Sequence, residues 1–168
     1  METTAYVGIG SNVGDKVRNC QEAIHQLQAT PGIEVSKISS LYYTEPVGYA
    51  HQDWFINCVV EIKTSLPPRE VFLRCKEIER GMGRTYLIKW GPRVIDLDLL
   101  FYNDLILREA DLEIPHPRLH ERGFVLIPLA ELNPTWIHPI FKKTVLELRQ
   151  ELKDFHEVKP YQGKNMAS

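Results

Sequence analysis

The stretch Trp90-Gly91-Pro92-Arg93-Val94-Ile95-Asp96-Leu97-Asp98-Leu99-Leu100-Phe101-Tyr102 carries two carboxylates, two residues apart, in an otherwise apolar and β-prone segment. Because side chains alternate across a strand, Asp96 and Asp98 should point to the same face, roughly 6–7 Å apart along the backbone. Carboxylates at this spacing can both reach a pair of hard cations roughly 4 Å apart. The residues expected to point the other way, into the core, are Ile95, Leu97, Leu99 and Phe101. The pattern predicts a divalent-metal site on one face of a strand.

An Asp-x-Asp pair alone is more often part of a half-exposed antiparallel strand whose acidic face is solvated. The flanking residues favour the metal site, because Gly91-Pro92 ends the preceding loop sharply and Arg93 brings a planar cation close to the two acids. Trp90 and Arg93 stand where they could serve a nucleotide.

The composition is that of one globular domain over residues 1–168, with 43% hydrophobic and 25% charged residues. The formal net charge of -2 argues against a general polyanion binder, so we expect no nucleic-acid partner. Charge is unevenly spread, however, because residues 69–93 hold seven basic side chains against three acidic ones. This local excess suits a small, highly charged anion.

The cysteines and the apolar pattern bear on location. Cys20, Cys58 and Cys75 are odd in number, well separated and set in apolar surroundings, which is typical of reduced core residues in a cytoplasmic protein. The chain shows neither a basic-then-apolar start nor a run approaching 18 apolar residues, so we expect neither secretion nor membrane spanning. Nothing in the apolar pattern calls for a second copy, and we expect a monomer.

The periodicity along the chain predicts an α+β fold of ferredoxin-like βαββαβ order, with an antiparallel sheet, helices on one face and the other face open. Residues 103–142 should add a short hairpin and a loop-rich cover, as part of a C-terminal extension whose polar tail frays from about residue 159. The expected strands and helices are, in chain order, a strand at 5–9, a helix at 15–29, strands at 33–43 and 54–63, a helix opened by Pro67-Pro68 and ended by Gly81 and Gly83, the Asp96–Asp98 strand, and a helix at 144–152.

Alternation in the strand at 54–63 places Phe55 and Asn57 on the open face together with Asp96 and Asp98. Two strands would thus contribute an aromatic ring, an amide and two acids to one surface, which is typical of a ligand site. The residues expected on the helix side are Trp54, Ile56, Cys58, Val60 and Ile62.

The chain resembles the 6-hydroxymethyl-7,8-dihydropterin pyrophosphokinase family of folate synthesis over nearly its whole length. The resemblance implies transfer of the pyrophosphoryl group of ATP to the pterin hydroxymethyl group, with release of AMP, as a step of tetrahydrofolate biosynthesis. The segments that carry it are Gly10-Ser11-Asn12, Thr44-Glu45-Pro46-Val47-Gly48, Phe55-Ile56-Asn57, Trp90-Gly91-Pro92-Arg93 with Asp96-Leu97-Asp98, Pro115-His116 and Glu121-Arg122-Gly123-Phe124.

The resemblance also implies site residues. Asp96 and Asp98 would bind two Mg²⁺ ions and act in catalysis with Arg84 and Arg93. Phe55 and Phe124 would stack on the pterin ring, and the Asn57 amide would read its amide-like edge. The residues implied around ATP are Lys76, Glu79, Trp90, Arg93, His116 and Arg122. The residues implied around the pterin are Thr44, Pro46, Val47, Gly48, Phe55, Asn57, Trp90 and Phe124.

Several of these residues have simpler interpretations. His116 could be a loop histidine with satisfied hydrogen bonds, Phe124 could be a core residue, and Lys76 could be a solvated helical lysine. The segment at 85–89 departs from the family pattern, in which the loop is longer and more basic. The sequence therefore does not indicate which cation assists Arg84.

Three other functional classes fit the sequence less well. A dinucleotide-binding loop at Gly8-Ile9-Gly10 fails because Gly14 comes one residue late. An RNA-binding module lacks the aromatic, basic run on the sheet and would carry two acids there. A regulatory domain should bind its ligand without Mg²⁺, whereas a pyrophosphokinase should need the metal.

Overall fold

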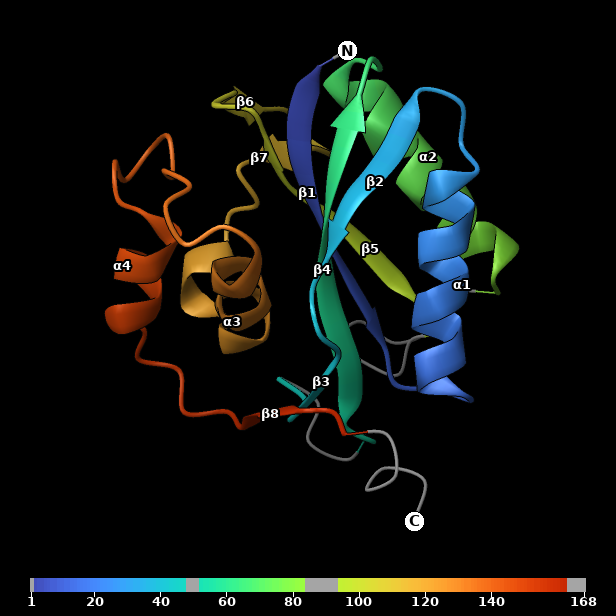
Figure 1. The fold of residues 1–168 in the computed structure, drawn as a ribbon, viewed down its shortest axis with the longest axis vertical. Helices are drawn as coiled ribbons and strands as arrows, with labels where there is room; N and C mark the ends of the chain where they lie inside the picture. The colour runs from blue at the N-terminus through green and yellow to red at the C-terminus, as the bar shows by residue number, and fades with distance from the viewer. Residues whose placement is uncertain (1, 48–51, 84–93, 163–168) are drawn as a thin grey trace.

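The computed structural model describes residues 2–47, 52–83 and 94–162, and the fold is α+β, built on an antiparallel sheet (Figure 1). Its elements are β1 (Thr3–Ser11), α1 (Lys16–Gln28), β2 (Ile33–Ile38), β3 (Tyr42–Thr44), β4 (Phe55–Thr64), α2 (Pro68–Gly81), β5 (Asp96–Tyr102), β6 (Leu107–Arg108), β7 (Glu113–Ile114), a 3₁₀ turn (Leu119–Glu121), α3 (Gly123–Leu132), α4 (Val145–Gln150) and β8 (Val158–Pro160).

The strands follow the order β5-β1-β4-β3-β8, and β2 also pairs with β4. The single strand expected at 33–43 is therefore two strands, which pair with successive halves of β4. Ser39 lies at the break and bonds to β4 with its backbone and side chain: its N–H donates to Val59 O (2.9 Å), and its Oγ accepts from Val59 N (2.9 Å). Hydrogen bonds from a serine side chain commonly replace ladder bonds at such breaks.

On one face of the sheet, α1 and α2 cover the larger core (Figure 1). Asp15 caps α1 by accepting from Arg18 N (3.2 Å), and Pro68 stands at the first turn of α2, where its missing N–H costs nothing. The three cysteines are buried and reduced, as predicted. The alternation predicted for β4 is confirmed from Ile56 onward, because this core contains Ile56, Cys58, Val60 and Ile62. Trp54, predicted on the same side, precedes β4 and stacks on Tyr43 outside this core.

The opposite face is not open, contrary to the prediction. α3 lies against it and builds a second core, in which Val59 of β4 meets Leu126 and Leu129 (Figure 1). The sequence did not indicate α3 because the helix is apolar nearly all round and contains Pro128, so it lacks the amphipathic period that marks a surface helix.

The prediction for Phe101 was also wrong. β1 pairs with β5 as Val7 with Leu99 and Tyr6 with Phe101, which leaves Leu100 as an extra residue at a β-bulge. Alternation fails at such a residue, and both Leu100 and Phe101 lie in the second core. There the Phe101 ring meets Tyr6 edge-on, with ring centroids 6.4 Å apart.

Residues 159–161 are paired rather than frayed, contrary to the prediction, and residues 163–168 of the predicted tail lie outside the described residues. Lys159 lies in β8, which pairs with β3, and Tyr161 N donates to Leu41 O (2.8 Å). The segment is polar but is paired through its backbone, which composition does not reveal. Among the described residues, the structure has no helix with the length and apolar character needed to cross a membrane.

His138 is a buried histidine outside the sheet, with 2% of its surface exposed. Its Nδ1 accepts from Ile140 N and Phe141 N (3.2 Å each), and its ring stacks on Phe141. Burial, followed by the nearby His120, lowers the pKa of His138 to about 4.

This pKa predicts a loss of stability in acid. The unfolded histidine takes up its proton near pH 6.5, whereas the folded one stays neutral down to about pH 4. The stability that neutral His138 contributes is therefore present above pH 6.5 and is lost as the pH falls toward 4. At pH 5 this loss should lower the free energy of unfolding by about 2 kcal/mol. Urea unfolding of wild type and His138→Asn at pH 7 and pH 5 should show a smaller pH effect in the variant; equal effects would contradict the assignment.

Candidate active site

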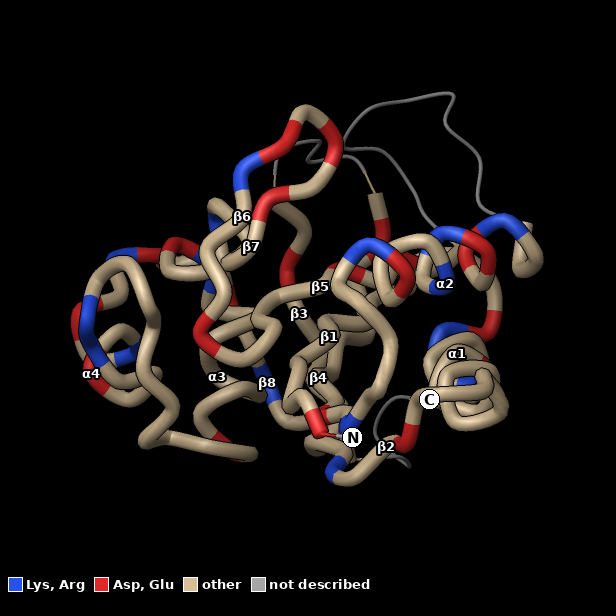
Figure 2. The backbone as a smooth tube through the Cα atoms, turned by 90° about the horizontal axis from the view of Figure 1, so that it is seen from above, with Lys and Arg blue, Asp and Glu red and all other residues tan. Residues whose placement is uncertain are grey.

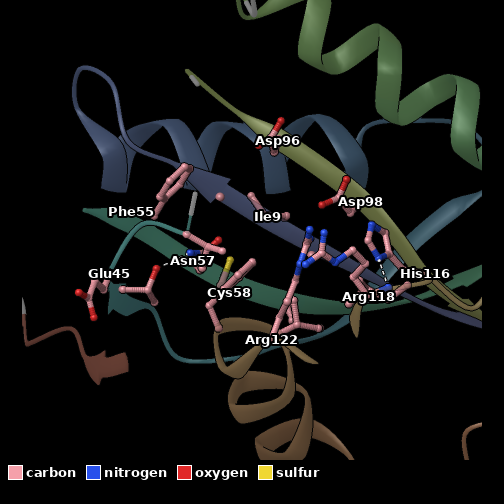
Figure 3. A pocket seen from close by; sticks show the side chains of 18 of the residues that line it. Ile9, Glu45, Phe55, Asn57, Cys58, Asp96, Asp98, His116, Arg118 and Arg122 are labelled. Carbon is pink, nitrogen blue, oxygen red and sulfur yellow. Dashed lines mark hydrogen bonds between the residues drawn. The ribbon is translucent and has the colours of Figure 1, made fainter. Parts of the chain in front are cut away.

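A cavity of about 370 Å³ opens where β1, β4 and β5 meet the first turn of α3 (Figure 3). β3 and the residues after it form one side of the cavity, and residues 116–118 form the opposite side. The cavity therefore lies on the sheet face that carries the second core, at the end of the sheet that α3 leaves uncovered.

Asp96 and Asp98 both line this cavity, from the same face of β5 (Figure 3). Their cross-strand neighbours on β1 are Gly10 and Gly8, respectively. Because neither neighbour has a side chain, the carboxylates are not covered from β1. Two carboxylates on one strand suit a hard divalent cation and leave its other coordination positions to oxygens of a ligand and to water. Across the described ranges, no three His, Cys, Asp or Glu side chains converge into a complete metal site.

Asn57 lies across the floor of the cavity and is 7% exposed. Its Nδ2 donates to Thr44 Oγ1 (2.6 Å), which fixes the amide plane. A Cβ at Gly10 would stand 2.3 Å from the Asn57 side-chain oxygen, so a glycine is required there. Phe55 lines the same part of the cavity and borders Gly10 as well. This end of the cavity thus combines a fixed amide with an aromatic ring.

The other end of the cavity is cationic. The guanidinium groups of Arg118 and Arg122 reach into the cavity from two sides, toward Asp98 (Figure 3). Burial lowers the pKa of Arg122, and the like charge of Arg118 lowers it further. The negative charge of Asp98 raises this pKa and so opposes both effects. Arg122 is half-buried, whereas the Arg118 side chain is 49% exposed and its Nε donates to Glu121 Oε1 (3.2 Å). Two guanidinium groups facing the same space are typical of a phosphate-binding site.

His116 lies beside these cations and Asp98 in the lining of the cavity (Figure 3). Its Nδ1 accepts from Arg118 N (3.2 Å), and its backbone N–H donates to Leu100 O (3.0 Å). The first bond places the ring proton on Nε2 in the neutral form. Burial lowers the pKa of His116, an effect that Asp98 opposes. Nδ1 of His116 thus has a hydrogen-bond partner within its loop, as the simpler interpretation predicted, and the residue also lines the cavity.

A second cavity, of about 280 Å³, adjoins the first, and the two share Asp98, His116 and Pro117. Phe72 and Lys76 of α2 line one wall, and the hairpin at residues 109–113 lines the other. Figure 2 shows acidic residues along this hairpin and both signs of charge along α2. Arg69 of α2 pairs with Glu109 and Asp111 and so ties the two walls together.

Glu79, expected at the nucleotide, lines neither of these cavities. Its side chain is 0% exposed, and its Oε2 accepts from Leu97 N (2.7 Å) while its Oε1 meets Lys76 Nζ (3.2 Å). Leu97 lies between the two acids of β5, so Glu79 fixes the backbone that carries them.

The predicted site residues are thus largely brought together. Lys76 lines the second cavity, Pro46 lies beside the first without lining it, and Gly48, Arg84, Trp90 and Arg93 lie outside the described residues. The sequence prediction missed Arg118, Glu45 and Gly8; an arginine two residues after His116 was the available signal for the first. The predicted residues that line the first cavity are Thr44, Val47, Phe55, Asn57, Asp96, Asp98, His116, Arg122 and Phe124.

Comparisons with known proteins place the chain in one family. Residues 6–134 match the family described as 7,8-dihydro-6-hydroxymethylpterin-pyrophosphokinase. The chain is 43% identical, over 154 residues, to the 2-amino-4-hydroxy-6-hydroxymethyldihydropteridine pyrophosphokinase of Aquifex aeolicus, covering 90% of this chain and 95% of that one. It is 46% identical to the Bacillus subtilis protein of that name, covering 79% of each.

Among solved structures, a Plasmodium falciparum HPPK-DHPS crystal structure matches 90% of this chain and 45% of its own, with a TM-score of 0.71 and 16% identity. At this identity the match shows the fold alone. Relatives also include the Lactococcus lactis bifunctional protein FolKE, 37% identical over 95% of this chain and 46% of that one.

The position of Glu79 makes a prediction about stability. Glu79→Ala should lower the free energy of unfolding by about 1–3 kcal/mol, because it leaves the buried Leu97 N–H without this acceptor. Urea denaturation measures the change. Glu77→Ala removes an exposed carboxylate of the same helix, paired with Arg74, and should change stability by less than about 1 kcal/mol. Equal losses in both variants would show that the bond to Leu97 contributes nothing specific.

Proposed function

The chain belongs to the 7,8-dihydro-6-hydroxymethylpterin-pyrophosphokinase family and transfers the pyrophosphoryl group of ATP to 6-hydroxymethyl-7,8-dihydropterin in folate biosynthesis; we propose that the two adjoining cavities are where it does so. The observation that supports this location is the meeting of two carboxylates, two guanidinium groups and a fixed amide around one space. The shared residues Asp98 and His116 mark the junction, where the transferred group would pass.

Two Mg²⁺ ions are proposed at Asp96 and Asp98. The donors fit, since both carboxylates face the cavity from one strand, opposite glycines. Bound Mg²⁺ supplies neutralisation of the charge on the triphosphate. Glu79 acts behind β5 by fixing the backbone between the two acids.

The pterin is proposed to occupy the first cavity, at the end formed by Asn57 and Phe55. The bond to Thr44 holds the Asn57 amide in one plane, ready to meet the donor and acceptor edge of a flat ring. Phe124 borders the cavity from α3 and would complete the stack with Phe55. Residues 46–48, beside Thr44, and Trp90 are proposed in the same role on the resemblance.

The nucleotide is proposed to occupy the second cavity, with its phosphates directed toward Asp98. Lys76 lines that cavity, and Arg122 and His116 stand at the junction. Arg118 adds a second guanidinium on the phosphate side. Arg84, Arg93 and Trp90 are proposed around the triphosphate on the resemblance. Positioned cations lower the barrier by stabilising the charge of the transferred group, so the reaction needs no strong base.

We further propose a ferredoxin-like arrangement for the sheet, because β1 and β4 are its central strands, with β5 on one side and β2 and β3 on the other. A single domain, a monomeric state, a cytoplasmic location and the absence of a nucleic-acid partner are proposed on the composition and the reduced cysteines.

Product analysis tests the function. The protein, ATP, Mg²⁺ and 6-hydroxymethyl-7,8-dihydropterin should yield AMP and pterin pyrophosphate in equal amounts, with no product when Mg²⁺ is chelated. ADP would indicate transfer of a single phosphoryl group. In the same assay Asp98→Asn, which keeps shape but removes charge, should lower kcat by at least about 100-fold. Wild-type turnover in a folded Asp98→Asn protein would exclude the metal role.

The two cavities can be separated by a pair of aromatic substitutions. Phe55→Ala should raise KM for the pterin by roughly tenfold and leave KM for ATP within about twofold, because stacking contributes about 1 kcal/mol or more. Phe72→Ala, in the second cavity, should show the reverse pattern. Equal effects of one variant on both substrates would count against this placement.

A further inference from the structure

The segment at residues 152–161, here called the C-terminal strap, leaves α4, passes the first turn of α3 and joins β3 as β8 (Figure 1). Beside β3, the backbone of the strap is bonded to Glu45, which lines the first cavity. Glu45 N donates to Glu157 O (2.9 Å), and Glu157 N donates back to the Glu45 carboxylate (2.9 Å). Glu45 lies between Thr44 and the half-buried Pro46, so the strap fixes one wall of the cavity.

The strap also supplies the cap of α3. Arg122, at the N-cap position, makes no capping bond with its own side chain. The carboxylate of Asp154 takes its place, because Oδ2 accepts from Gly123 N (3.1 Å). The other oxygen accepts from His156 N (3.0 Å) and meets His156 Nδ1, so the carboxylate is held from two sides. An acidic group at the start of a helix binds N–H groups that have no partner within the helix.

Side chains of the strap also pack against Gly123. A Cβ at Gly123 would stand 3.3 Å from Leu152 Cδ2, 3.6 Å from Val158 Cγ2 and 3.6 Å from the Asp154 carboxylate. The strap therefore lies directly on the backbone of Gly123. The residues on either side of this glycine, Arg122 and Phe124, both line the first cavity.

We propose that the C-terminal strap is a positioning element of the active site and that Asp154 is the positioning residue, which sets Arg122 and Phe124 through its hydrogen bond to Gly123. One short segment is bonded to both β3 and α3, so it fixes the separation of two cavity walls that come from distant parts of the sequence. Asp154 lines neither cavity, and its side chain is 9% exposed. This proposal rests on the proposed function.

Steady-state kinetics test the proposal with variants of the full chain. Asp154→Ala should raise KM for both 6-hydroxymethyl-7,8-dihydropterin and ATP by roughly tenfold, because Phe124 is proposed to stack on the pterin and Arg122 to meet the phosphates of ATP. Asp154→Asn keeps an oxygen acceptor for Gly123 N and should stay within about threefold of wild type. The matched control is Phe155→Ala, since this neighbour is 96% exposed and should be replaceable without effect on either KM.

The readout separates positioning from simple destabilisation. A smaller folded fraction lowers the apparent kcat at unchanged KM, whereas displaced walls raise KM. If Asp154→Ala does not fold, Val158→Ala loosens the same contact and should raise both KM values. Unchanged KM values in folded Asp154→Ala or Val158→Ala, or an Asp154→Asn protein as impaired as the alanine variant, would overturn the proposal and leave the proposed function intact. A wild-type protein without pterin-dependent turnover would overturn both.

Discussion

The pairing of β1 with β5 is the constraint on which the site depends. It sets Gly8 opposite Asp98 and Gly10 opposite Asp96, so the two acids face a strip of sheet without side chains. β1 also pairs with β4, on the side away from β5, and Gly10 of β1 leaves room there for the amide of Asn57. Carboxylates and amide are therefore placed by strand registers, which are strongly specified where a face of the sheet is buried.

The sheet carries a core on each face, and the cavity lies where the second core ends. α1 and α2 cover one face, while α3 covers only part of the other. Leu100 keeps the face of Asp96 and Asp98 by ordinary alternation, and the bulge turns Phe101 to this face as well. The two acids, which precede Leu100 in β5, lie beside the cavity. A single strand thus contributes to two cores and to a site, because an extra residue changes which face its side chains occupy.

Buried polar groups position the site from behind. Glu79 bonds the backbone between the two acids, Thr44 holds the Asn57 amide, and Asp154 bonds the first turn of α3. Each is paired, as burial of a polar group requires. The residues that face the cavity are consequently held in place by hydrogen bonds within the protein, before any ligand binds.

The sequence by itself determined the periodic and local features. Alternation in β4, the stripes of α1 and α2 and the shared face of Asp96 and Asp98 follow from the spacing of residues in regular structure. The motifs around these residues also carry the family resemblance. The remaining features depend on long-range contacts: the bulge at Leu100, the burial of the uniformly apolar α3, the place of Glu79 behind β5, and the pairing of residues 158–160 as β8. A backbone hydrogen bond between distant segments leaves no mark on side-chain periodicity, so none of these could be predicted from spacing alone.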